Sequence, residues 1–188
     1  MTIAVLFART DSVYKTFPDC DVWDVERDAR KWQGGCRVIA HPPCRTWGKM
    51  RHFSHASAED HAMAPWAVTQ VQTYGGVLEH PADSQLWPTA GLFPPGTRCD
   101  AFSGWTLQIF QWWFGHRAQK NTRLYIVGCP PKDLPPLPYR LGTATHIISS
   151  LSTRKGPHRP EVTKAEREQT PLKLAQWLVE VAHRCRPP

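Results

Sequence analysis

Hydrophobic residues along this chain occur in short runs separated by polar or glycine-rich turns. Residues 3–8 are continuously apolar, which is typical of a strand buried on both faces of a sheet. Residues 21–25 alternate between apolar and polar positions, as a strand with one buried face does. The pattern predicts strands at 3–8, 21–25, 37–40, 77–79 and 124–127, with 146–148 as a short last strand.

Other stretches place apolar residues at helical spacing. Ser57 is a predicted N-cap with the acidic Asp60 three positions later, and Gly75 ends the helix that follows. Residues 105–114 are predicted to form a second helix, and charged residues at 164–168 are interpreted as a solvated helical face. A final helix should begin with Thr170 as its cap and Pro171 at its first position. The apolar residues that this helix should bury are Leu174, Trp177, Leu178 and Val181.

The alternation of strands and helices with short connections predicts an α/β protein. With 188 residues and no internal repeat, the chain should form a single Rossmann-like domain over residues 1–188. We expect a mostly parallel sheet of about five strands. Residues 160–188 should form a C-terminal helical segment that packs on this sheet.

Composition excludes several classes of protein. No run of about 18 apolar residues is present and the start lacks the basic region of a signal peptide, which predicts a cytoplasmic protein without a membrane span. The six cysteines form no Cys-x-x-Cys pair, so reduced thiols are expected. The nine histidines show no zinc-binding spacing, so no metal is predicted.

The net charge of +7 favours a polyanionic partner. Basic residues lie near aromatic ones in the sequence, which suits DNA through phosphate neutralisation and base stacking. An ordinary basic surface over a tryptophan-rich core is the alternative explanation. The residues predicted to contact DNA are Arg45, Lys49, Arg51, His116, Arg117 and Lys120.

Reactive or charged side chains lie just after several predicted strands, namely Asp11, Asp24, Cys44 and Glu79. Ligands gather at the carboxyl ends of strands in open α/β sheets, so we expect a site there. Cys44 follows two prolines and has basic neighbours that should favour a thiolate nucleophile. A buried, inert cysteine is the alternative.

Glu79 ends a predicted buried strand, where burial should raise its pKa and let it protonate or hydrogen-bond a ring nitrogen. A solvated turn or a helix cap is the alternative for this residue. The first predicted loop carries Arg9, Asp11 and Ser12, which suit a phosphate or a nucleotide. Capping by Asp11 or Ser12, with Arg9 paired to Asp28, is the alternative there.

Pro43-Cys44 and Glu79 resemble the Pro-Cys and Glu-Asn motifs of cytosine-5 DNA methyltransferases, and the similarity covers residues 3–128. In that family the cysteine attacks C6 of a flipped cytosine and the glutamate engages N3, which implies Cys44 and Glu79 as catalytic residues. Asp24 matches the acidic residue that the family places near the cofactor ribose. The chain as a whole is similar to short phage-encoded proteins of a degenerate form of this class.

Three departures from the family pattern change the expected cofactor. Phe7 is followed by Ala8-Arg9-Thr10 rather than by a glycine-rich loop, His80 replaces the asparagine, and little chain remains for a target-recognition domain. We therefore expect no S-adenosylmethionine in the usual pose. A phosphorylated nucleotide is the alternative cofactor, bound near Arg9, Asp11, Ser12 and Asp24.

These observations lead to three functional hypotheses. The first is a phage-type, DNA-modifying transferase that acts on a pyrimidine, with Cys44 as nucleophile and Glu79 as acid or N3 partner. The second is a non-catalytic, DNA-binding relic with a protective or anti-restriction role. The third is a nucleotide-processing enzyme in which Glu79 attacks a sugar carbon and Cys44 only packs. The transferred group, the target base and the oligomeric state are left open.

Overall fold

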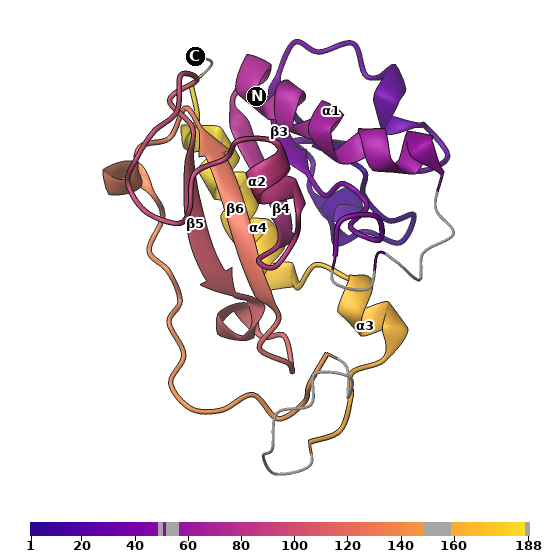
Figure 1. The fold of residues 1–188 in the computed structure, drawn as a ribbon, viewed down its shortest axis with the longest axis vertical. Helices are drawn as coiled ribbons and strands as arrows, with labels where there is room; N and C mark the ends of the chain where they lie inside the picture. The colour runs from indigo at the N-terminus through magenta and orange to yellow at the C-terminus, as the bar shows by residue number, and fades with distance from the viewer. Residues whose placement is uncertain (49–50, 52–56, 149–158, 187–188) are drawn as a thin grey trace.

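The computed structural model describes residues 1–48, 51, 57–148 and 159–186. Over these ranges the chain forms a single α/β domain around a six-stranded sheet (Figure 1). The strands are β1 (Ile3–Leu6), β2 (Cys20–Trp23), β3 (Arg37–Ala40), β4 (Gly76–Pro81), β5 (Trp105–Phe110) and β6 (Asn121–Val127). The helices are α1 (Ala58–Tyr74), α2 (Leu86–Thr89), α3 (Lys164–Glu168) and α4 (Leu172–Arg184), with 3-10 turns η1 (Val13–Thr16), η2 (Ala29–Lys31), η4 (Gln111–Phe114) and η5 (Pro131–Asp133).

The strand order is β2-β1-β3-β4-β6-β5, and the sheet is mixed. Among the described strands, β2, β1, β3 and β4 pair in parallel, whereas β4–β6 and β6–β5 are antiparallel. The α/β class is thus confirmed. The expected mostly parallel sheet of about five strands describes only one half of this sheet, because β5 was predicted to be helical.

The segment 105–114 is the main error of the sequence prediction. It forms strand β5 followed by the 3-10 turn η4 instead of a helix. Its buried residues Trp105 and Ile109 fit a helical period, but its aromatic and β-branched composition favours a strand. Pairing with the full length of β6, from Trp105 opposite Ile126 to Phe110 opposite Asn121, decides between the two.

Other boundaries shift by a few residues. β1 ends at Leu6 rather than at residue 8, because Phe7 adopts a left-handed backbone with φ of 59°. Residues 146–148 make only isolated bridges, from His146 to Ala118 and from Ile147 to Glu161. The N-cap of α4 is Pro171 itself, one residue later than expected.

Helices cover both faces of the sheet. Ile3 and Val5 of β1 pack in the cluster that contains α4, whereas Ala4 and Leu6 pack in the cluster that contains α1. This alternation places α4 and α1 on opposite faces (Figure 1). The four residues predicted to be buried by the last helix, Leu174, Trp177, Leu178 and Val181, are buried. The capping box of Ser57 and Asp60 also starts α1 as predicted.

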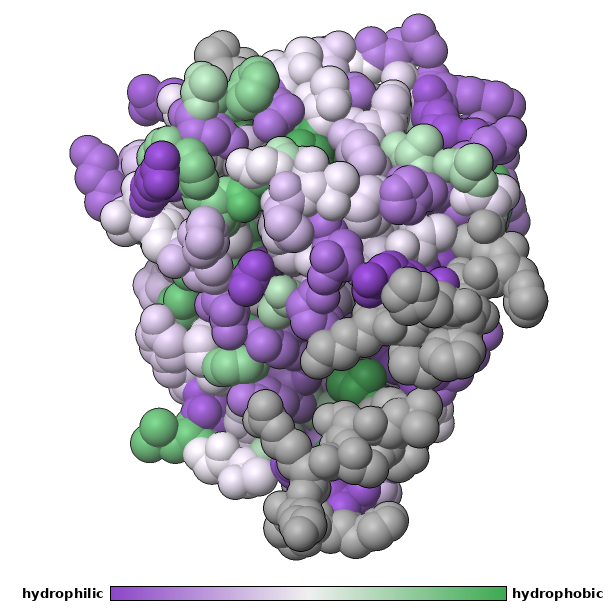
Figure 2. Space-filling view, viewed as in Figure 1, coloured by the Kyte–Doolittle hydropathy of each residue, from purple (hydrophilic) through white to green (hydrophobic). Residues whose placement is uncertain are grey.

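The surface is mostly polar on the face drawn in Figure 2, where hydrophobic residues form small separate spots among hydrophilic ones. Among the residues that the structure describes, the exposed large hydrophobic ones come from separate parts of the chain, and are Met1, Val25, Phe102, Tyr139, Leu141 and Leu172. Within the described ranges, no helix is both long and apolar enough to cross a membrane.

Candidate active site

The two residues proposed to be catalytic lie at the same edge of the sheet. Cys44 follows β3, and Glu79 lies near the carboxyl end of β4, its parallel neighbour. Because β6 is antiparallel to β4, its first residues also lie at this edge, where Thr122 pairs with Pro81. Lys120 immediately precedes β6, and Gln111 immediately follows β5. The edge therefore combines residues from both halves of the sheet.

Glu79 is the best-supported side chain of this site. Its side chain is 14% exposed, and His41 Nδ1 lies 3.2 Å from its Oε2. Gln111 Nε2 donates to its Oε1 over 3.0 Å and also contacts the Thr122 hydroxyl at 3.1 Å. The Tyr14 hydroxyl lies 3.1 Å from His41 Nε2. Both carboxylate oxygens thus have partners, which fixes their orientation.

These partners stabilise the ionised form of Glu79. Burial acts to raise the pKa of the carboxyl, but the hydrogen bond from His41 and the positive charge of Lys120 outweigh it and lower the pKa to about 2. An ionised carboxylate only accepts hydrogen bonds, so His41 donates from Nδ1 to Glu79, while its Nε2 contacts the Tyr14 hydroxyl. The expected raised pKa of Glu79 is wrong, because burial is outweighed.

Cys44 is exposed, in a loop that the Pro42-Pro43 pair stiffens. Desolvation by the surrounding loop and the negative charge of Glu79 raise the pKa of its thiol, against the opposing charge of Lys120. The expected thiolate is therefore not favoured at rest. Of the basic neighbours expected to favour the thiolate, Arg45 forms an ion pair with Asp60, and Lys49 lies outside the described residues.

Lys120 belongs to this site rather than to the outer surface. Its side chain is half-buried, and burial lowers the pKa of its ammonium, against the charges of Glu79, Cys44 and Glu168. Its backbone φ of 35° lies in the left-handed region, which is costly for a residue with a side chain. Strained backbone of this kind concentrates at functional sites, which makes Lys120 a further candidate residue beside Cys44 and Glu79.

The polar side chains Arg9, Asp11 and Ser12 of the first loop all have hydrogen-bond partners within the protein. Arg9 donates from Nε to Asp11 Oδ1 over 2.8 Å and from Nη1 to Glu168 Oε2 over 2.8 Å. Ser12 caps η1 by accepting from the Tyr14 amide. The alternative pairing of Arg9 with Asp28 is wrong, because Asp28 pairs with Arg30 instead.

Asp24 is 3% exposed and is held by several donors. Lys15 Nζ lies 2.7 Å from its Oδ2, and its Oδ1 accepts from the amides of Glu26 and Arg27. These bonds, with that from Lys15 the strongest, lower the pKa of the carboxyl despite its desolvation.

The residues predicted to contact DNA lie in different surroundings. His116 is 3% exposed and its ring nitrogens contact the backbone of Ala118 and Glu166, so neither is directed to a phosphate. Arg117 is exposed but binds Glu166. Arg51 contacts the Gly48 carbonyl at 3.5 Å, and Lys49 lies outside the described residues.

Sequence reasoning missed three supporting residues of this site. His41 directly precedes the Pro42-Pro43 pair at the end of β3, so the argument used for Cys44 applies equally to it. Gln111 lay in a segment predicted to be helical, which hid its place after β5. Tyr14 is a buried aromatic residue of η1, and the sequence carries no signal for its contact with His41.

His80, which follows Glu79, lies on the other face of β4. It is fully buried and packs edge-on against Trp87, with ring centroids 6.3 Å apart. Burial lowers the pKa of its imidazole to about 4, so it is neutral near pH 7. His80 is therefore a core residue and does not face a ligand beside Glu79.

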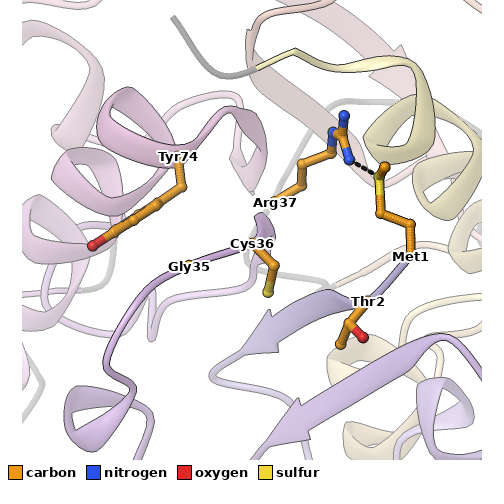
Figure 3. Close-up of a pocket in the computed structure, with 6 residues that line it drawn as sticks. All are labelled: Met1, Thr2, Gly35, Cys36, Arg37 and Tyr74. Atoms are coloured by element: carbon orange, nitrogen blue, oxygen red, sulfur yellow. Dashed lines mark hydrogen bonds between the residues drawn. The ribbon is translucent and has the colours of Figure 1, made fainter.

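A hollow lies at the opposite edge of the sheet from Cys44 and Glu79 (Figure 3). It lies at the amino ends of β1 and β3, and its lining residues are Met1, Thr2, Gly35, Cys36, Arg37 and Tyr74. The Arg37 guanidinium contacts the Met1 sulfur there. Across the described part of the chain, no group of three or more His, Cys, Asp or Glu residues could hold a metal ion.

Comparisons of the chain with protein-family models, with curated proteins and with solved structures gave no match.

Proposed function

We propose that this protein modifies a pyrimidine base in DNA, with Cys44 as nucleophile and Glu79 as the partner of ring atom N3. The observation that carries this proposal is the placement of a thiol just after β3 and a fixed carboxylate near the carboxyl end of β4, its parallel neighbour. Lys120 supports it, because its ammonium interacts electrostatically with both groups. In this reaction the Cys44 sulfur adds to C6, the C5–C6 electron pair moves towards O4, and Lys120 offsets the negative charge that develops.

The state of Glu79 narrows the base. An ionised carboxylate accepts a hydrogen bond but cannot donate one. Uracil and thymine carry a proton on N3, whereas the N3 of cytosine is itself an acceptor and would oppose Glu79. The proposed target is therefore a uracil- or thymine-type base, unlike that of the resembled family. Because the Cys44 thiol is protonated at rest, its proton must leave to solvent as the sulfur attacks, and the exposure of Cys44 permits this.

Mass spectrometry of nucleosides from DNA co-expressed with the protein tests this function. A modified deoxyuridine or thymidine is expected, and it should disappear with Cys44→Ser and with Glu79→Gln. Cys99→Ser is the matched control, because Cys99 is also an exposed cysteine. A modified cytosine would overturn the choice of base. Duplex binding without any modified nucleoside would instead favour the non-catalytic relic.

A second candidate, a nucleotide-processing enzyme, is favoured by the contrast between an ionised, well-held Glu79 and a protonated thiol. Here a Glu79 oxygen bonds to the sugar carbon while the glycosidic bond breaks and the base leaves with its electron pair. Base release from free pyrimidine nucleotides, measured by chromatography, tests it. Glu79→Gln should abolish that release and Cys44→Ser should leave it intact. For the first candidate, by contrast, both substitutions should abolish activity.

A further inference from the structure

Two glutamates of one short segment pair with cations at the edge of the sheet that holds the candidate site. We define the α3 segment as residues 163–169, which contain α3 and lie at the end of the molecule opposite the two termini (Figure 1). Glu168 Oε2 accepts from Arg9 Nη1 at 2.8 Å, and Glu166 Oε1 accepts from Arg117 Nε at 2.9 Å. Two cations that sequence analysis assigned to phosphate groups therefore hold carboxylates of the same chain.

Backbone carbonyls of the same segment contact two more side chains of the site edge. The Gln169 carbonyl lies 3.5 Å from Lys120 Nζ, and the Glu166 carbonyl lies 3.3 Å from His116 Nε2. All these contacts span large separations in sequence, from 49 residues for Arg117 to 159 residues for Arg9. The segment therefore lies beside the cations of the site because of the tertiary fold, not because of local chain geometry.

The α3 segment is attached weakly compared with α4. The helix α3 has five residues and none of them is buried, whereas α4 buries six residues in the core. In its ion pairs the side-chain exposures are 35% and 46% for Arg9 and Glu168, and 51% and 23% for Arg117 and Glu166. Ion pairs this exposed contribute little to stability and are screened by salt. Another anion can therefore replace these carboxylates at small cost.

We propose that the Glu166 and Glu168 carboxylates of the α3 segment are internal ligands, which compete with the phosphate backbone of DNA for Arg117 and Arg9 while the Gln169 carbonyl contacts Lys120. Carboxylates and phosphates bind the arginine fork in the same way, so the two occupants exclude each other. This inference rests on the proposed function only in taking DNA as the polyanion. DNA binding then requires release of Glu166 and Glu168, which frees the Arg117 fork and Nη1 of Arg9 for a phosphate, while Nε and Nη2 of Arg9 stay paired with Asp11.

The test compares two double variants of equal charge in the full chain. Glu166→Gln with Glu168→Gln removes both competing carboxylates, and Glu59→Gln with Glu180→Gln removes two exposed carboxylates that pair elsewhere, with Arg30 and Arg184. Fluorescence anisotropy with a duplex of about 20 base pairs at ~0.1 M salt should show about three- to tenfold tighter binding for the first variant than for this control. Adding Arg9→Gln and Arg117→Gln to the first variant should remove the gain.

Equal affinity of the two double variants would overturn the inference. So would a gain that survives the added arginine substitutions, or a gain seen with thymidine monophosphate but not with the duplex. Thermal melting by circular dichroism checks that each variant is folded. If the double variant melts early, the single substitutions Glu166→Gln and Glu168→Gln replace it, and each should give part of the gain in affinity. Modified nucleosides without any affinity gain would refute this inference alone, whereas the gain without modified nucleosides would refute the proposed chemistry alone.

Discussion

The sheet has a parallel half, formed by β2, β1, β3 and β4, and an antiparallel half, formed by β6 and β5. The two halves contribute different kinds of group to the candidate site. The parallel half supplies groups from loops, and its reactive residue Cys44 is exposed. The antiparallel half supplies Gln111 and Thr122, which are 1% and 0% exposed and hydrogen-bond to each other. Glu79 lies on β4, the last strand of the parallel half, which pairs with β6 of the antiparallel half. It receives one hydrogen bond from each half, from His41 and from Gln111.

In this comparison the parallel half supplies the proposed reactive thiol, and the antiparallel half supplies groups that hold Glu79 in place. Loops after parallel strands can present an exposed thiol, but they do not fix its position as firmly as a ladder does. The antiparallel ladder between β5 and β6 fixes Gln111 and Thr122 and directs a donor at Glu79. Glu79 is thus held from both sides at the junction between the two halves, and the following predictions test this junction.

The largest effect is expected at the start of β4. A Cβ at Gly76 would lie 2.0 Å from the Val38 carbonyl oxygen, and Gly76 has a φ of 131°. Gly76→Ala should therefore separate β4 from β3 and lower the free energy of unfolding by about 3 kcal/mol or more. Gly91→Ala is the control, since Gly91 has a φ of 66° but no atom within 4 Å of its Cβ position. Urea denaturation that shows equal losses for both would contradict the close contact of β3 and β4.

The next effect is a pH dependence that comes from Glu79. Its folded-state pKa of about 2 lies below the usual 4.5 of a glutamate, so its contribution to stability is fully present above pH 4.5 and is lost as the pH falls through about 2. The free energy of unfolding of the wild type should exceed that of Glu79→Gln near neutral pH. We expect this difference to narrow by about 3 kcal/mol between about pH 5 and about pH 2. A difference that stays constant in urea titrations over this range would argue against the ionised carboxylate.

A smaller effect is expected on the parallel side. Tyr14→Phe removes the hydroxyl that contacts His41 Nε2 and should lower the free energy of unfolding by about 1 kcal/mol. Tyr139→Phe removes a hydroxyl from a residue that is 70% exposed and serves as the matched control. If chemical denaturation gives the same small change for both, the contact of Tyr14 with His41 does not support Glu79.

The parallel half of the fold was largely predictable and the antiparallel half was not. Buried parallel strands such as β1 and β3 are short continuous apolar runs, so their sequence signal is direct. β5 mixes aromatic, β-branched and polar residues, and only its pairing with β6 shows that it is a strand. The antiparallel pairing of β6 with β4 and β5, and with it the position of Gln111, could not be predicted from the local sequence pattern.

The candidate site was predictable to a similar extent. The ends of β3 and β4 identified Cys44 and Glu79, because the chain order of parallel strands places such ends at one edge. The low pKa of Glu79 could not be predicted, since it depends on contacts with His41 and on Lys120, which are 38 and 41 residues away in sequence. The pairing of Arg9 with Glu168 likewise joins opposite ends of the chain.

The central claim is that Cys44 from the parallel half, Glu79 at the junction and Lys120 from the antiparallel half form one electrostatic site. The rate of Cys44 alkylation by iodoacetamide as a function of pH tests it most directly, with the exposed Cys99 as an internal reference. Glu79→Gln removes a charge that raises the pKa of the Cys44 thiol, so alkylation near pH 7.5 should become about two- to fivefold faster. Lys120→Met removes a charge that lowers this pKa, so alkylation should slow by a similar factor of about two to five. Unchanged rates at Cys44 in both variants would contradict the account.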